Sequence, residues 1–197
     1  MSSQMSIAPR QALNPRQAET VQRLWEAGLA ELRETGHEAL TIRVVAARAG
    51  VSPATAYTYL ASKSHLFAEL FWRHLTAGDP PPVTGATAVE RVQATVRATT
   101  DRIVAEPALA AAVTPALLGT DPDVERLRLR IGAELVRRFE TALAGSEGHD
   151  PVRPALLDAL VLAFSGALLQ AGMGIFTYEH MADRLEQAVA VIVAGNA

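Results

Sequence analysis

Small and hydroxyl-bearing residues gather between Thr41 and Tyr59 in this chain of 197 residues. Ser52 followed by Pro53 is typical of a helix start, because serine caps free amide groups and proline suits the first helical position. Small side chains there let the backbone approach DNA closely, and hydroxyl groups can donate to bases or phosphates. These residue types therefore predict contact with the major groove of double-stranded DNA.

The surrounding residues have the spacing of a helix-turn-helix. We expect one short helix over residues 41–49 and a second over 52–59, crossing at a steep angle. Ala46 and Ala56 keep their contact narrow, and Gly50 supplies the left-handed backbone that ends the first helix. An ordinary tight helical corner is the alternative interpretation. The agreement of helix length, glycine position and hydroxyl cluster favours a DNA-binding unit.

Each candidate DNA contact has a chemical reason. The methyl groups of Ala54 and Thr55 can meet thymine methyl groups, and tyrosine hydroxyls on the second helix can donate to phosphates on either side of the groove. A lysine at the start of the next helix adds its charge to the helix amide dipoles, which attract phosphate. The predicted DNA contacts are Thr41, Arg43, Ser52, Pro53, Ala54, Thr55, Tyr57, Tyr59 and Lys63.

Sequence signals for catalysis or a bound metal are missing. The five histidines do not fall at metal-ligand spacing with a carboxylate, and there is no HExxH motif, nucleophile elbow or glycine-rich phosphate loop. Cysteine is absent, which removes disulfides and thiolate sites and suits a reducing compartment. We therefore expect a cytoplasmic protein that is not an enzyme and needs no cofactor or metal.

Charge is divided unevenly along the chain. Residues 1–76 hold eight basic and six acidic residues, and the remainder holds ten basic and fifteen acidic residues. This division suits a head that contacts DNA on a body that avoids it, although chance scatter is the alternative. The first ten residues lack the apolar core of a signal peptide, and we expect no stretch long and apolar enough to span a membrane.

The hydrophobic pattern predicts an all-α fold of about nine helices. Apolar residues recur three and four positions apart in nearly every segment, and proline and glycine separate the segments. Asn14 and Pro15 begin the first predicted helix, and Gly36 ends it. Later helices are expected from Ser62 to Thr76, from Thr87, after Pro107, from Asp121, and over residues 155–175 and 178–194.

Residues Leu40 to Phe67 resemble the TetR family of transcriptional regulators. The shared pattern is Leu-Thr-Ile, then Val-Ala, Ala-Gly-Val-Ser, Thr-x-Tyr-x-Tyr and Ser-Lys-x-x-Leu-Phe. Its length and its place near the amino terminus of an all-helical chain make the match specific. Ala56 stands where the family usually has leucine, and Leu60 where it usually has phenylalanine. We expect both to face the core of the head, so they affect packing and not DNA contact.

The resemblance implies a regulator that binds DNA as a homodimer. Two recognition helices would enter successive major grooves of a palindromic operator, and the last two helices of each subunit would pair with their twins. Residues 1–61 would form the DNA-binding head, with 1–13 disordered, and residues 62–197 the body for ligand binding and dimerisation. We expect a repressor that a small molecule releases. A helical ligand-binding or adaptor protein whose head contacts protein is the alternative.

The segment 155–175 supports part of this independently. It is apolar almost all round, so it has more hydrophobic surface than one body can cover. A purely internal central helix is the alternative. The run Gly78-Asp79-Pro80-Pro81-Pro82 cannot be helical, and we expect it to separate head from body. Residues 145–154 have the composition of a loop.

The resemblance also implies an effector cavity inside each body, enclosed by the fourth through eighth helices. No buried arginine or lysine is evident in the apolar stripes, which favours a hydrophobic or amphipathic effector of fatty acyl, steroid or terpenoid type over a phosphorylated sugar. For any single candidate, an ordinary core position is the alternative. The candidates are Phe67, Phe71, Val96, Thr100, Ile103, Val113, Leu117, Leu118, Phe139, Phe164 and Leu168.

Overall fold

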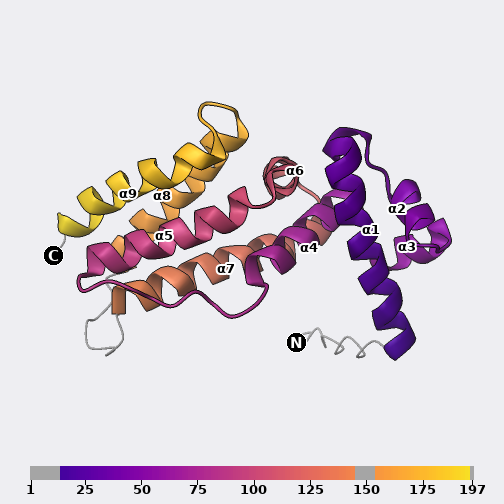
Figure 1. Cartoon of the computed structure of the whole chain (residues 1–197), viewed down its shortest axis with the longest axis horizontal. Helices are drawn as coiled ribbons and strands as arrows, with labels where there is room; N and C mark the ends of the chain where they lie inside the picture. The colour runs from indigo at the N-terminus through magenta and orange to yellow at the C-terminus, as the bar shows by residue number, and fades with distance from the viewer. Residues whose placement is uncertain (1–13, 145–153, 196–197) are drawn as a thin grey trace, which may run out of the picture.

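The computed structural model describes residues 14–144 and 154–195, which form nine helices and no strand (Figure 1). The all-α prediction is therefore confirmed over this part of the chain. The predicted disorder of residues 1–13 and nearly all of the predicted loop at 145–154 lie outside the described residues.

Three helices form the head: α1 (Pro15–Ala39), α2 (Ile42–Arg48) and α3 (Pro53–Tyr59). Each begins at a side-chain cap, because Asn14, Thr41 and Ser52 accept the backbone N–H of the residue three positions later. Gly36 breaks the helical geometry of α1 at φ 76°, as its predicted role as a helix end requires, and a last turn follows it to Ala39.

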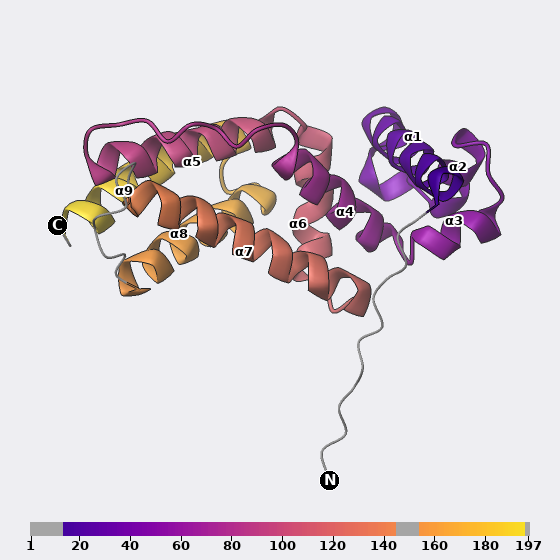
Figure 2. The same cartoon turned by 90° about the horizontal axis from the view of Figure 1, so that it is seen from below.

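Six helices follow and form the body: α4 (Lys63–Thr76), α5 (Ala88–Val104), α6 (Pro107–Leu118), α7 (Pro122–Ala144), α8 (Pro154–Gly172) and α9 (Tyr178–Ala194). Their starts agree with the predicted ones to within a residue or two, and the segment expected to reach residue 175 ends as a helix at Gly172. Head and body lie side by side along the longest axis of the molecule (Figures 1 and 2). α4 runs from the head into the body, where it contacts α6 and α7.

The proline run does not separate head from body, so that expectation is wrong. Pro80, Pro81 and Pro82 connect two body helices, α4 and α5, and they line a small pocket together with residues of α5 and α7. Figure 2 shows this connection running beside α5. The predicted division at residue 61 lies instead in the short turn between α3 and α4.

One continuous hydrophobic core joins the head to the body. It includes Leu24 and Val45 of the head and Phe71, Phe139 and Phe164 of the body, all of which are buried. The rings of Phe139 and Phe164 meet edge to face with centroids 5.9 Å apart. The packing of the two parts is therefore continuous across their junction.

Helix α8 differs from what we expected of it. Its length and composition meet the requirement for a membrane span, so the expectation that no segment would do so is wrong. A single helix of this kind is weak evidence for a membrane protein, since core helices of soluble proteins pass the same test. Little of α8 is buried within the chain, and Leu162 is 72% exposed. Its outer face is therefore an exposed apolar surface.

We predict that Gly172→Ala destabilises the chain by about 1–3 kcal/mol, because it overpacks the contact between α8 and α6. A Cβ atom at Gly172 would lie 2.6 Å from Cγ2 of Thr114, and the Thr114 hydroxyl also lies 3.3 Å from that of Tyr178. Gly132→Ala is the matched control: a Cβ there meets nothing within 4 Å, so it should stabilise α7 by about 0.5–1 kcal/mol. Urea unfolding measures both, and equal effects would contradict the predicted close packing.

Candidate DNA-binding surface

The turn between α2 and α3 has the geometry of a helix-turn-helix. Gly50 adopts φ 67°, and the N–H of Val51 donates to the carbonyl of Ala46 over 3.0 Å. Ala46 and Ala56 are fully buried where the helices meet, so no larger side chain separates them. Ala56 and Leu60 are the two departures from the TetR pattern, and both are buried. Both therefore belong to the core, as predicted.

The nine predicted DNA contacts come from the start of α2, from α3 and its cap, and from the first residue of α4. Tyr57 is 50% exposed, so its ring and hydroxyl are accessible to a bound molecule. Most of the nine are exposed, namely Thr41, Arg43, Ser52, Pro53, Ala54 and Tyr57, whereas Thr55, Tyr59 and Lys63 are half-buried.

Three hydroxyl groups of this surface also hold the helices in place. Thr41 Oγ1 accepts the N–H of Val44 over 3.3 Å, and Ser52 Oγ accepts that of Thr55 over 3.1 Å. The Ser52 and Thr55 hydroxyls lie 2.8 Å apart and share a hydrogen bond. Each hydroxyl has one donor and two acceptor positions, so these groups are fixed in orientation and still have hydrogen-bonding capacity.

Lys63 has a role that the sequence did not predict. Its ammonium group donates to the carbonyls of His37 and Glu38, over 2.8 and 3.1 Å, at the end of α1. A lysine ammonium has three donors, so one remains for a phosphate. In this structure Lys63 therefore joins the end of α1 to the start of α4, and its predicted phosphate contact would use the third donor.

Some of the positive charges of the head are neutralised by ion pairs, and others are not. Arg48 pairs with Glu31 over 3.0 Å and with Glu34, so it joins α2 to α1 and its charge is neutralised. Its hydrogen bonds hold the pKa of Glu34 below the usual value. Arg23 and Arg43 form no ion pair with the described residues. They supply unneutralised positive charge near the helix-turn-helix.

Two polar contacts connect the head and its junction to the body. Arg33 of α1 donates to Glu106, at the start of α6, by two hydrogen bonds, one of them 3.0 Å long. Ser62, the N-cap of α4, donates to Asp121, just before α7, over 2.5 Å. Each contact holds the pKa of its carboxyl group below the usual value, through the hydrogen bond from Arg33 or from Ser62.

We expect Glu106→Gln to lower the free energy of unfolding at neutral pH by at most about 1 kcal/mol, because Arg33 is half exposed and solvent screens the pair. Arg33 lowers the folded-state pKa of Glu106, so this contribution is present above the unfolded pKa near 4.3 and is lost as pH falls through the lower folded value. The difference between the two proteins should therefore vanish in acid. Urea melts at several pH values measure it, with Glu140→Gln as the exposed control; a constant difference would contradict it.

Most predicted effector residues lie in the packed core of the body. Phe67, Phe71, Val96, Thr100, Ile103, Val113, Phe139 and Phe164 are buried, and Leu117 and Leu168 are half-buried against them. Leu118 is 64% exposed at the end of α6, so its assignment to an internal cavity is wrong for this conformation. The Thr100 hydroxyl is buried without a hydrogen-bond partner among the described residues.

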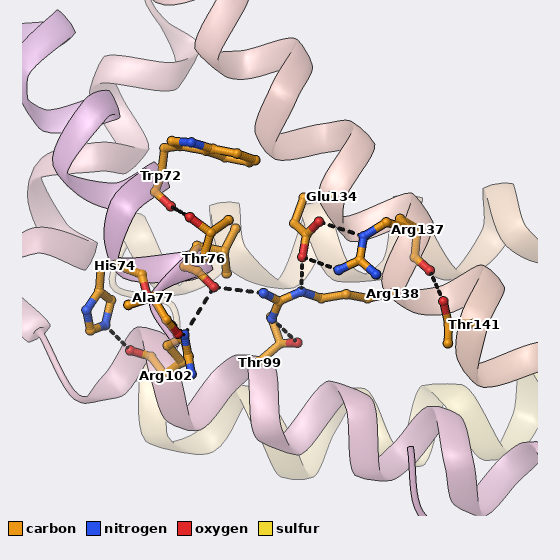
Figure 3. Close-up of polar contacts among 11 residues, drawn as sticks. Trp72, His74, Thr76, Ala77, Thr99, Arg102, Glu134, Arg137, Arg138 and Thr141 are labelled. Atoms are coloured by element: carbon orange, nitrogen blue, oxygen red, sulfur yellow. Dashed lines mark hydrogen bonds and ion pairs between the residues drawn. The ribbon is translucent and has the colours of Figure 1, made fainter. Parts of the chain in front are cut away.

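The expectation that no arginine would be buried is also wrong. Arg138 is 6% exposed, because it lies between Leu135 and Phe139 on the inner face of α7. Its guanidinium donates to Glu134 over 2.8 Å, to the Thr99 hydroxyl over 3.3 Å and to the Leu75 carbonyl over 2.7 Å (Figure 3). The spacing of 131, 135, 138 and 142 on one helical face could have revealed it. Arg138 thus binds the last turn of α4.

The described residues contain no group of three or more histidine, aspartate or glutamate residues placed to hold a metal ion. What they do present is a helix-turn-helix head at one end of an all-α body. Such an arrangement is typical of regulators that bind DNA through the second helix of the motif.

Comparison with known proteins identifies the family. Residues 24–70 match the model for bacterial regulatory proteins of the tetR family. The chain is 45% identical over 186 residues to an uncharacterized HTH-type transcriptional regulator of Mycobacterium tuberculosis, a match that covers 92% of this chain and 84% of that protein. It is 33% identical over 135 residues to the HTH-type transcriptional repressor KstR of Rhodococcus jostii, covering 66% of this chain and 63% of the repressor. The chain belongs to the TetR family.

Solved structures show the same fold. The crystal structure of a TetR transcriptional regulator from Rhodococcus sp. RHA1 matches with a TM-score of 0.73 at 20% identity, covering 93% of this chain and 100% of that one. This likeness confirms the predicted fold. The family model and the 45% identical relative show that the protein is a DNA-binding transcriptional regulator, which confirms the predicted family and general function. The individual DNA contacts, the effector residues and the division at residue 61 stay predictions.

Proposed function

We propose that this regulator is a dimeric repressor, which binds a palindromic operator and leaves it when a small molecule binds the body. The observation that carries the proposal is the exposed start of α3, where Ser52, Pro53, Ala54 and Tyr57 face solvent on a rigid helix-turn-helix. Small residues, hydroxyls and an exposed tyrosine suit a groove lined by bases and phosphates. The named relative KstR, a repressor, supports the direction of control.

A second copy of the chain is the expected partner of α8 and α9. Leu162 and Val191 are 72% and 76% exposed, and a groove lined by residues of both helices, Gly166 among them, lies on this side of the body. An exposed apolar face of this kind is typical of a subunit interface. In a two-fold dimer, α8 and α9 would pack against α8 and α9 of the second subunit. This packing would cover the exposed apolar face of α8.

The path from the body to the head runs through α4. Its first turn is tied to the head by Lys63 and to the start of α7 by Ser62, and its last turn is held by Arg138. A ligand that favours a different position of α4 would alter the spacing of the two heads, which must fit grooves about 34 Å apart. The predicted effector residues on α4 to α8 pack together here, so an effector would have to separate them.

The proposed site of action is the cytoplasm, where the bacterial chromosome lies. Because the relatives are transcriptional regulators, we propose no catalytic activity. The alternative is an adaptor whose head contacts protein. It makes a different prediction, since a protein contact would give no salt-dependent affinity for duplex DNA, whereas neutralising phosphates makes affinity fall steeply with salt.

The deciding experiment uses the full chain and duplex DNA from its own upstream region. Fluorescence anisotropy over a series of salt concentrations gives the affinity, and footprinting gives the protected sequence. We expect protection of an inverted repeat and a strong fall in affinity with salt. Weak binding that is equal for unrelated duplexes would overturn the proposal of a specific operator. The absence of any salt-dependent binding would favour the adaptor.

A further inference from the structure

A pocket of about 200 Å³ lies at the C-terminal end of α4, between this helix, α5 and α7. Trp72 and Leu75 of α4 supply its apolar lining, and Arg102, Arg137 and Arg138 supply its charge. Figure 3 shows these side chains and the polar contacts among them. The volume is below the roughly 300–1,000 Å³ of pockets for drug-sized ligands, so the pocket suits a small molecule.

Positive charge exceeds negative charge in this pocket. Three arginines line it with two acidic residues, Glu134 and Asp79. Glu134 is held by Arg137 over 2.7 and 2.8 Å and by Arg138 over 2.8 Å. The hydrogen bonds from Arg137, and after them that from Arg138, keep the pKa of Glu134 below its usual value. The Glu134 carboxylate is therefore charged at neutral pH. Asp79 is exposed and forms no ion pair with the described residues. One positive charge is left without a matching carboxylate.

Two of the three arginines have donors available. Arg102 uses one terminal nitrogen, Nη1, to bind carbonyls at the end of α4, including that of Ala77, and no hydrogen bond to the described residues engages its other two nitrogens. Arg137 is 51% exposed and pairs with Glu134 of its own helix. An exposed pair of this kind is weak, so Arg137 can turn toward another anion at small cost. Arg138, by contrast, is buried, and each of its three nitrogens donates to a described residue.

We propose that this pocket binds a small organic carboxylate, with Arg102 and Arg137 as its charged contacts and Trp72 against its apolar part. Guanidinium groups bind carboxylates through paired, charge-assisted hydrogen bonds, which gives the class of ligand. The acid would lie against the last turn of α4, the helix that connects body and head. Its effect on DNA binding rests on the proposed function, whereas the binding of the acid does not.

The test uses the full chain with benzoate as the acid and benzamide as its uncharged counterpart of similar shape. Tryptophan fluorescence reports binding, because Trp72 lines the pocket. Benzoate should give a saturable change that Trp72→Phe removes, and benzamide should bind at least about tenfold more weakly, as expected for a charge-assisted contact. Arg137→Gln should weaken benzoate by a similar factor. Arg126→Gln, an exposed arginine of the same helix outside this pocket, should not.

Thermal unfolding of each variant shows that it folds, and Arg137 is exposed enough for its replacement to leave the core intact. Equal binding of benzoate and benzamide, unchanged binding by Arg137→Gln, or the lack of any saturable signal from benzoate would each overturn the site. Operator affinity of the acid-free protein is measured separately. If the protein binds the operator but not benzoate, the proposed carboxylate site is wrong and the proposed function stands. If it binds benzoate but no operator, the proposed function is wrong and the carboxylate site stands.

Discussion

Tyr57→Ala is expected to weaken operator binding by about tenfold to a hundredfold, while the melting temperature stays unchanged. Tyr57 is 50% exposed and forms no hydrogen bond with the described residues, so its loss costs the folded state little. A hydrogen bond to a charged phosphate contributes about 1.5–3 kcal/mol, and a dimer would lose two of them. Anisotropy with the footprinted duplex measures the effect.

Two further variants separate the hydroxyl from the ring. Tyr57→Phe should cost nearly as much as Tyr57→Ala if the phenol hydroxyl donates to phosphate, and much less if the ring contacts a base. Glu140→Gln, an exposed position on α7, is the control and should bind as the unaltered protein does. If Tyr57→Ala retained full affinity and full selectivity for the operator, α3 would not be the reading helix that we predict.

Leu162→Asp should convert the proposed dimer into a monomer. Because operator binding is proposed to need two heads, it should then be lost at concentrations where the unaltered protein binds. Leu162 is 72% exposed on α8, so the subunit fold tolerates aspartate there. In a two-fold interface the change occurs twice, and each copy loses about 1.5–3 kcal/mol of leucine burial and buries a charge. The dissociation constant of the dimer should therefore rise by at least about a hundredfold.

Light scattering after size-exclusion chromatography measures the mass directly. Leu129→Asp is the matched control for oligomeric state, because Leu129 is 67% exposed but lies on α7, away from the proposed interface. A Leu162→Asp protein that keeps the mass of a dimer would place the interface elsewhere on the body. A monomer that still binds the operator with full affinity would show that DNA binding does not depend on this pairing.

Local sequence signals predicted the helices well because the devices that start and end them are local. Asn14 with Gln17, and Thr87 with Glu90, form the reciprocal capping pairs expected from three-residue spacing. The turn at Gly50 likewise depends on residues that are neighbours in the chain. The role of the proline run was predicted wrongly. Its composition indicates that a helix ends there, but it does not indicate which two parts of the molecule the run connects.

The side-chain partners that join distant segments could not be predicted in this way. Arg48 finds Glu31 and Glu34 across the head, and Arg138 finds the carbonyl of Leu75, which is 63 positions away. These contacts depend on how whole helices pack, which one sequence does not specify. The burial of Arg138 was accessible from helical periodicity, but its hydrogen bonds to α4 and α5 were not.

The position of Lys63 has a consequence for how this regulator can evolve. The same ammonium group closes the end of α1 through the carbonyls of His37 and Glu38 and lies at the predicted phosphate contact. If Lys63 binds phosphate as predicted, a substitution there would alter both the contact between α1 and α4 and the affinity for DNA. The predicted base contacts on α3, by contrast, are separate side chains, and each of them can be replaced alone. At Lys63 few replacements would be tolerated, because a new side chain would have to keep both the contact with the end of α1 and the predicted phosphate contact.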